Sequence, residues 1–303
     1  MKGIILSGGN GTRLYPSTNI ISKQLLPVYD KPMIYYPLST LMLAGIKEVA
    51  IISTPRDLPN YQMLLGGGTS LGIEISYFEQ PEPRGLADAF LVCESFIKDE
   101  NVALILGDNI FYGNTKFHEI VNNFSGGAMI FGYPVQNPER YGVLDFDRDG
   151  GIKGIIEKPI QAPSNYAVPG FYLYDNTVVS RAKRLKPSER GEIEITDLNV
   201  SYLSDSSLNV QLLGRGIAWF DTGTSKSLVE ASAFLESVES VQSYKIGCIE
   251  EISLRKKFIN LKSFDSLLEK IPPSQYKDYL LKIRPEFSSD SNLSSSTIER
   301  LQS

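Results

Sequence analysis

Short apolar runs alternate with helical patterns through the first half of the chain, and this alternation restricts the fold more than any other feature. The runs read as strands at residues 2–6, 48–53, 73–78, 102–106 and 128–133, and the helical patterns at 34–43, 86–96 and 117–124. Strands that are apolar on both faces must be covered on both faces. The pattern therefore predicts an α/β fold with a Rossmann-like, mostly parallel sheet covered by helices.

The second half of the chain has a different pattern. Shorter strands are predicted at residues 142–146, 151–156, 170–174, 208–213 and 216–220, with a helix at 175–185. This spacing indicates an antiparallel-leaning extension of the sheet. Helices are predicted at 225–237, 250–258, 264–270 and 275–283, and the serine-rich tail at 286–303 is predicted to be disordered.

No linker rich in Ser, Pro or Gly separates the two halves, so we expect one continuous core. We place it at residues 1–224, with its halves at 1–133 and 134–224, and a C-terminal helical segment at 225–285.

Composition excludes several classes of protein. With 303 residues, 42% hydrophobic residues and a net charge of −5, the chain is of ordinary globular composition and a poor candidate for non-specific nucleic-acid or membrane binding. No apolar run approaches the ~20 residues of a membrane span. Cys93 and Cys248 suggest neither a disulfide framework nor a zinc site, and no signal-peptide pattern opens the sequence, so we expect a cytoplasmic protein. His118 is the only histidine.

A glycine loop follows the first predicted strand. Residues 8–11 read Gly-Gly-Asn-Gly, and Thr12 and Arg13 come next. Such a loop can bring backbone N–H groups close to an anion. The P-loop triplet Gly-Lys-Ser/Thr is missing, and the third glycine of the dinucleotide pattern is replaced by Leu14. With Lys23 downstream, the pattern favours a polyphosphate site. The alternative is an ordinary turn followed by two surface cations, which would give the same sequence pattern.

Two aspartates stand at the ends of predicted strands. Asp108 follows the apolar run 102–106, and Asp221 follows the run that contains Trp219. Carboxylates at strand ends face the ligand crevice of an α/β sheet, and Mg²⁺ needs few protein ligands when it also binds phosphate oxygens. The alternative for Asp108 is a helix N-cap, and Thr222 or Thr224 could cap the helix that follows Asp221.

Charged residues also follow the later strands. Glu157 and Lys158 end the predicted strand 151–156 and could hold a sugar hydroxyl and a phosphate, or form a solvated turn. Residues 190–197 place one cation, Arg190, and three acids at a predicted helix start, where the helix dipole favours acids.

Taken together, these pieces resemble the sugar-1-phosphate nucleotidylyltransferases, in particular those that use dTTP and glucose 1-phosphate. The matching segments are residues 8–14, 22–37, 106–113, 157–159, 165–170 and 219–224, in the family's order. The resemblance covers residues 1 to about 285.

The resemblance implies a role for each matching position. The nucleotide would be bound by Gly8, Gly9, Gly11, Thr12, Arg13, Lys23, Gln24, Gln80, Gly85, Asp108 and Asn109. Glucose 1-phosphate would be bound by Gly142, Glu157, Lys158, Val168, Tyr172 and Arg190. Asp108 and Asp221 would bind Mg²⁺, and the catalytic residues would be Arg13, Lys23, Asp108, Lys158 and Asp221.

The resemblance also implies regulation and assembly. A second nucleotide site for the feedback inhibitor dTDP-L-rhamnose would involve Tyr112, Gly113, His118, Glu119, Gly214, Arg215, Glu250 and Glu251. It would lie at a subunit interface of a homo-oligomer, a tetramer, to which the segment 225–285 contributes.

One loop departs from the family. Where the family more often has an acidic or small residue and a glutamine, this chain has Arg84 and Asp88.

The reaction that the resemblance implies is direct in-line transfer of dTMP from dTTP to glucose 1-phosphate, with release of pyrophosphate. A uridylyltransferase and a non-catalytic nucleotide-sugar sensor are the alternatives.

Overall fold

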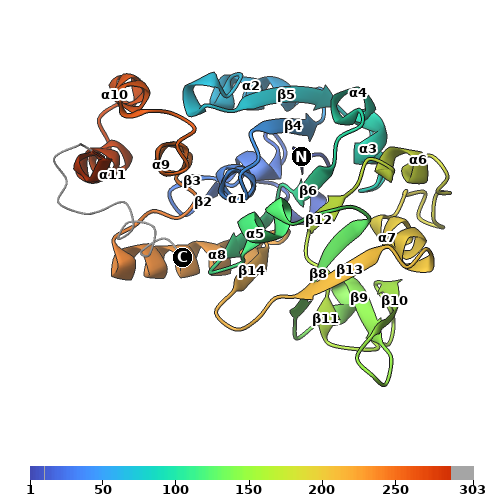
Figure 1. Ribbon diagram of the computed structural model, residues 1–303. Helices are drawn as coiled ribbons and strands as arrows, with labels where there is room; N and C mark the ends of the chain where they lie inside the picture. Colours follow the sequence, from blue (N-terminus) through green and yellow to red (C-terminus); the bar gives the residue numbers. More distant parts are fainter. Residues whose placement is uncertain (10, 288–303) are drawn as a thin grey trace.

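A ten-stranded sheet forms the centre of the computed structural model, which describes residues 1–9 and 11–287 (Figure 1). Residues 286 and 287 close the 3-10 helix Arg284–Phe287 (η5), so the predicted disorder is wrong for these two. The remainder of the predicted tail, residues 288–303, lies outside the described residues. Within them, no helix is long and apolar enough to cross a membrane.

The first half of the chain forms the parallel part of the sheet. β1 (Lys2–Leu6) lies between β4 (Glu48–Ser53) and β6 (Val102–Leu106), and β5 (Glu74–Glu79) pairs with β4 at the edge. All of these pairs are parallel, as predicted. The chain leaves β1 toward one side and later returns to its other side, so a crevice opens beyond the carboxyl ends of β1 and β6.

The second half forms the antiparallel extension. β12 (Phe171–Tyr174) pairs antiparallel with both β6 and β8 (Ala128–Pro134). β11 (Tyr166–Ala167), β9 (Gly142–Phe146) and β10 (Ile152–Glu157) continue the sheet, while β13 (Leu208–Leu212) runs parallel to β8.

Helices cover both faces of the sheet, which explains the continuous apolar strands. In β1, Ile5 packs on one face and Ile4 on the other, and both are fully buried. The face of Ile5 carries α1 (Tyr35–Leu43), α2 (Leu58–Leu65), α5 (Phe117–Asn122), α9 (Ile249–Arg255), α10 (Leu261–Lys270) and α11 (Gln275–Ile283). The face of Ile4 carries α3 (Asp88–Val92), α4 (Glu94–Ile97), α6 (Val178–Ala182) and α7 (Ile195–Ser204). The last three helices, α9, α10 and α11, therefore share one apolar core with the sheet.

Two small sheets lie beside the main one. β7 (Asn109–Tyr112) pairs with β14 (Ala218–Asp221), and β2 (Pro27–Val28) pairs with β3 (Lys31–Pro32). The strand predicted at 216–220 therefore exists but does not join the extension. Because Asp108 is followed by β7 and not by a helix, it is no N-cap, whereas Thr224 does cap α8 (Ser225–Gln242) through a capping box with Ser227.

Candidate active site

The crevice beyond β1 and β6 holds a cleft of about 350 Å³. The two strand ends are held together where the Gly107 N–H donates to the Leu6 carbonyl at 2.9 Å. A Cβ on Gly107 would lie 2.5 Å from Ser7 Oγ, so only glycine permits this close approach. Asp108 therefore enters the cleft directly beside the glycine loop.

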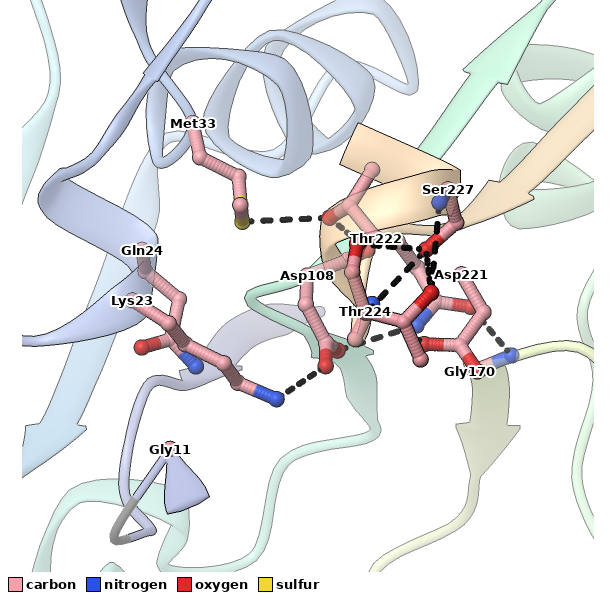
Figure 2. A network of polar contacts seen from close by, with 12 residues as sticks. Gly11, Lys23, Gln24, Met33, Asp108, Gly170, Asp221, Thr222, Thr224 and Ser227 are labelled. Atoms are coloured by element: carbon pink, nitrogen blue, oxygen red, sulfur yellow. Dashed lines mark hydrogen bonds and ion pairs between the residues drawn. The ribbon is translucent and has the colours of Figure 1, made fainter. Parts of the chain in front are cut away.

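Asp108 is the first of two carboxylates in the cleft. Lys23, from the 3-10 helix Lys23–Leu25 (η2), donates a hydrogen bond to Asp108 Oδ2 (Figure 2). Asn109 Nδ2 donates to Oδ1 at 3.1 Å. Burial by itself would raise the Asp108 pKa, but the Lys23 charge and these hydrogen bonds outweigh it and lower the pKa. Asp108 is thus an anion neutralised by one cation.

Asp221 is the second carboxylate. It ends β14 opposite Asn109 of β7, which places it next to Asp108. Burial and the neighbouring Asp108 charge raise its pKa above the ordinary value. The Gly223 N–H donates to Oδ1 at 3.1 Å, and Arg140 Nη2 lies 3.7 Å from Oδ2.

Thr222 and Asn109 connect the two strand ends. The Asp108 carbonyl accepts the Thr222 N–H at 3.0 Å and the Thr222 Oγ1–H at 2.7 Å. Asn109 Oδ1 accepts the indole N–H of Trp219 at 2.6 Å and the Gly170 N–H at 3.0 Å. The Asn109 amide therefore orients the scaffold in this structure, and the residue also lines the cleft in which the resemblance places the nucleotide.

The two carboxylates fit a divalent metal. Burial and the Asp108 charge raise the Asp221 pKa, and a dication between the two carboxylates would stabilise both as anions. The described residues contain no group of three or more His, Cys, Asp and Glu arranged for a metal. A pair of carboxylates suits Mg²⁺, which keeps waters and completes its shell with phosphate oxygens.

The sugar-side candidates line the same cleft. Gly142, Glu157, Lys158, Val168, Tyr172 and Arg190 all lie there with Asp108 and Asp221. Glu157 Oε2 accepts the Thr196 hydroxyl at 2.5 Å, and its Oε1 lies 3.4 Å from Lys158 Nζ and 3.5 Å from Arg190 Nη2. Charged groups of both signs thus line this side of the cleft.

The residues assigned to nucleotide binding in and after the glycine loop line two neighbouring hollows. Gly8, Arg13, Lys23 and Gln24 line the cleft. Gly9 and Thr12, the latter in the 3-10 helix Thr12–Leu14 (η1), line an adjacent hollow of about 720 Å³. A Cβ on Gly223 would lie 2.7 Å from Arg13 Nη2, which places this guanidinium beside the Asp221 strand end.

Gln80 and Gly85 flank the loop that departs from the family. Gln80 is 4% exposed, and its Nε2 donates to Asp88 Oδ2 at 2.7 Å. Gly85 has φ +104°, and a Cβ there would lie 2.4 Å from the Ile193 carbonyl oxygen. Gly85 is therefore required by the packing of this loop against the segment before α7.

The residues assigned to a second nucleotide site are only partly brought together. Gly113 approaches the loop of Gly214 and Arg215, since a Cβ on Gly113 would lie 2.3 Å from the Gly216 carbonyl oxygen. Tyr112 packs its ring on Phe234. His118 and Glu119 lie in α5, where the His118 ring bonds to the Ala44 carbonyl and Asn122.

Glu250 and Glu251, the last members of that set, are buried in α9. Tyr276 donates to Glu250, and Tyr279 and Arg255 donate to Glu251. Within this chain, both carboxylates therefore bond to the C-terminal helices.

Sequence reasoning missed Arg140, Thr196 and the hydroxyl contact of Thr222. Arg140 ends the 3-10 helix Pro138–Arg140 (η4) just before a predicted strand, a position that could have drawn attention to it. Thr196 lies 39 residues from Glu157, and the sequence gives no sign of their hydrogen bond.

Comparison with known proteins identifies the family. Residues 2–238 match the family model of the nucleotidyl transferases. The chain belongs to this family. A relative from Neisseria meningitidis serogroup A, named glucose-1-phosphate thymidylyltransferase, is 52% identical over 286 residues, which cover 93% of this chain and 99% of that protein. A relative of the same name from Mycolicibacterium smegmatis is 50% identical with the same coverage.

Solved structures of the family share the fold. A Bacillus anthracis structure solved with sucrose, whose protein has the provisional name glucose-1-phosphate thymidylyltransferase, superposes with a TM-score of 0.72. It is 41% identical and covers 77% of this chain and 94% of its own. UDP-glucose pyrophosphorylase with UDP-glucose has a TM-score of 0.68 at 26% identity, over 78% and 98% of the two chains. The nucleotidyl transferase family thus accounts for the α/β fold and shows that the chain is a nucleotidyltransferase.

Proposed function

We propose that the protein transfers dTMP from dTTP to glucose 1-phosphate, giving dTDP-glucose and pyrophosphate, with Mg²⁺ as the cofactor. The observation on which the proposal rests is the cleft itself. Its lining contains the carboxylates Asp108 and Asp221 together with the cations Arg13 and Lys23 on the side of the glycine loop. On the other side it contains Glu157, Lys158 and Arg190. The names of the relatives at about half identity support the choice of substrates.

The reaction needs positioning and charge neutralisation more than proton transfer. The phosphate oxygen of glucose 1-phosphate is already an anion and attacks the α-phosphorus in line, so no general base is required. In agreement, His118 lies in α5 and bonds to the Ala44 carbonyl. Bound Mg²⁺, held by Asp108 and Asp221, would supply charge stabilisation.

The side chains of the cleft have separate tasks in this mechanism. Arg13 and Lys23 neutralise the triphosphate, and Lys23 can exchange its bond to Asp108 for one to a phosphate oxygen. Lys158 holds the attacking phosphate. Glu157, fixed by the Thr196 hydroxyl, accepts from a sugar hydroxyl.

A pyrophosphate-release assay tests the proposal, with the four dNTPs, UTP and CTP against a panel of sugar 1-phosphates. We expect dTTP with glucose 1-phosphate to be preferred. UTP should follow within about a hundredfold in kcat/KM, because one methyl group contributes only ~1–3 kcal/mol. A clear preference for UTP would make the enzyme a uridylyltransferase, and binding without turnover of any pair would make it a sensor.

The metal assignment has its own test. Asp221→Asn should abolish turnover and Mn²⁺ binding while circular dichroism and the melting temperature show a folded protein. Full activity of the unmodified enzyme in excess EDTA would refute the assignment.

We also propose feedback inhibition by dTDP-L-rhamnose at a second site, in a homotetramer. The support is the family resemblance, together with the approach of Gly113 to the loop of Gly214 and Arg215.

A further inference from the structure

Asp88 is a fully buried carboxylate next to the nucleotide side of the cleft. Its exposed fraction is 0%, and it opens α3 directly after the loop that departs from the family. Arg84 Nη2 lies 2.9 Å from Asp88 Oδ1, and Gln80 Nε2 donates to Oδ2 at 2.7 Å. Oδ1 therefore faces the arginine, whereas Oδ2 accepts its short bond from Gln80 and a longer one, at 3.4 Å, from Arg84 Nε.

This arrangement leaves the Gln80 amide a single orientation. An ionised carboxylate only accepts hydrogen bonds, so the amide NH₂ of Gln80 must face Asp88. The amide oxygen, Oε1, must then face the opposite way. A flipped amide would place its oxygen against the carboxylate, which is repulsive.

Gln80 Oε1 faces the glycine loop. A Cβ on Gly8 would lie 2.9 Å from this oxygen, and Gly8 lines the cleft together with Leu86. Because Gly8 has no side chain, the oxygen is left uncovered at this point. In the part of the chain that the structure describes, no donor reaches it. A strong acceptor with fixed direction is thus available beside the nucleotide side of the cleft.

We propose that Asp88, held by Arg84, is a positioning residue for base selection. It fixes Gln80 Oε1 as an acceptor and thereby selects nucleobases that carry an N3–H donor. Thymine and uracil have this donor, whereas cytosine presents a bare N3 acceptor at the same position. The proposal deepens the proposed function, because it rests on Gln80 contacting the base of the nucleotide substrate.

The replacement Asp88→Asn tests the orientation directly. Arg84 only donates, and its short bond at 2.9 Å goes to Oδ1 while its bond to Oδ2 is 3.4 Å long, so the new carboxamide places its oxygen at the Oδ1 position and turns its NH₂ toward Gln80. Gln80 then flips and presents NH₂ to the base. The ratio of dissociation constants for dCTP and dTTP, measured by titration calorimetry at fixed MgCl₂, should fall by roughly tenfold to a hundredfold, the effect of one mismatched hydrogen bond. An unchanged ratio in a folded variant would overturn the proposal.

A second variant guards against misfolding of the first. Gln80→Met keeps the length of the side chain but removes both polar atoms, so the discrimination between dTTP and dCTP should shrink without inverting. If discrimination persists in this variant, Gln80 is not the reader and the proposal fails.

Asp57→Asn is the matched control. Asp57 is also buried and also paired with a neighbouring arginine, Arg56, at 2.8 Å. The Asp57→Asn variant should leave the ratio of the dCTP and dTTP dissociation constants unchanged, whatever its effect on the rate of turnover. A shift as large as that of Asp88→Asn would mean that any loss of a buried carboxylate perturbs this ratio.

The calorimetric ratio is independent of catalysis. If the protein binds dTTP with the predicted selectivity but does not turn it over, the proposed function fails and the role of Asp88 stands. If it turns over dTTP while Asp88→Asn and Gln80→Met leave the ratio unchanged, only the role of Asp88 fails.

Discussion

Thr222→Val should weaken both the fold and the metal site, because Thr222 joins the strand ends of the two carboxylates. Thr222 is fully buried, and its hydroxyl donates to the Asp108 carbonyl at 2.7 Å. Valine has nearly the same shape, so no cavity forms. The Asp108 carbonyl also keeps its bond from the Thr222 N–H at 3.0 Å. The hydroxyl has one proton, which lies between the Asp108 carbonyl and Met33 Sδ at 3.2 Å, so the loss is one hydrogen bond, about 0.5–1.5 kcal/mol in the free energy of unfolding.

This loss has two measurable consequences. A change of 1 kcal/mol lowers the melting temperature of a chain of this size by about 2–4 °C. If the bond also fixes the spacing of Asp108 and Asp221, the dissociation constant for Mn²⁺ should rise by about threefold to tenfold, since 1.4 kcal/mol is a factor of ten. Thermal unfolding and Mn²⁺ titration by electron paramagnetic resonance measure the two effects separately.

Thr40→Val provides the matched control. Thr40 is 5% exposed, and its hydroxyl donates to the Tyr36 carbonyl at 3.1 Å within α1. It should lower stability by a similar or smaller amount and leave Mn²⁺ affinity unchanged. The reasoning is refuted if the Thr222 variant binds Mn²⁺ as the unmodified protein does, or if both variants weaken binding equally.

Three further predictions concern the sugar side, the second site and stability. Lys158→Ala should raise the KM for glucose 1-phosphate at least tenfold with little change in dTTP affinity. The control Lys153→Ala, on the same hairpin, should change neither quantity. Equal losses for both substrates in the Lys158 variant would show that the two subsites are not separate. Arg215→Ala should relieve inhibition by dTDP-L-rhamnose, and unchanged, purely competitive inhibition against dTTP would place the inhibitor in the cleft. Asp30→Asn should make the free energy of unfolding less sensitive to acid. Burial would raise the Asp30 pKa, but Lys31 and Lys245 lower it. The ionised carboxylate therefore stabilises the fold above about pH 4, and this contribution is lost as the pH falls through the lowered pKa. Urea unfolding at pH 6 and pH 3 measures this, and equal losses on acidification for both proteins would contradict it.

The parallel half of the fold was predictable because burial on both faces leaves a direct mark on the sequence. The strands at 2–6, 48–53 and 102–106 have the predicted bounds. The helix Leu58–Leu65 was missed, although its buried residues Leu58, Tyr61 and Leu65 have helical spacing. The pattern predicted parallel pairing in this half but not which strands are neighbours. The apolar run near Trp219 predicts a strand, but only tertiary structure decides that it pairs with β7 outside the main sheet.

The candidate site was predictable to the extent that its residues follow strand ends. Asp108 and Asp221 follow different strands, and the general geometry of α/β sheets suggested that such residues meet in one crevice. The contacts that fix them could not be predicted in the same way. Thr222 reaches the carbonyl of a residue 114 positions away, and no local pattern records this bond.

The loop of Arg84 and Asp88 shows where sequence and structure complement each other. The sequence identified two charged residues where the family more often has others, which suggested a changed charge near the base. The structure shows that Arg84, in the loop before α3, pairs with Asp88 at the start of that helix, so the two charges cancel. What the sequence could not reveal is that Asp88 is fully buried and uses its second oxygen to orient Gln80 at the end of β5. In our proposal, the departure from the family acts through the direction of one amide group. Base selectivity is the property in which we expect this enzyme to differ measurably from a variant that lacks the carboxylate.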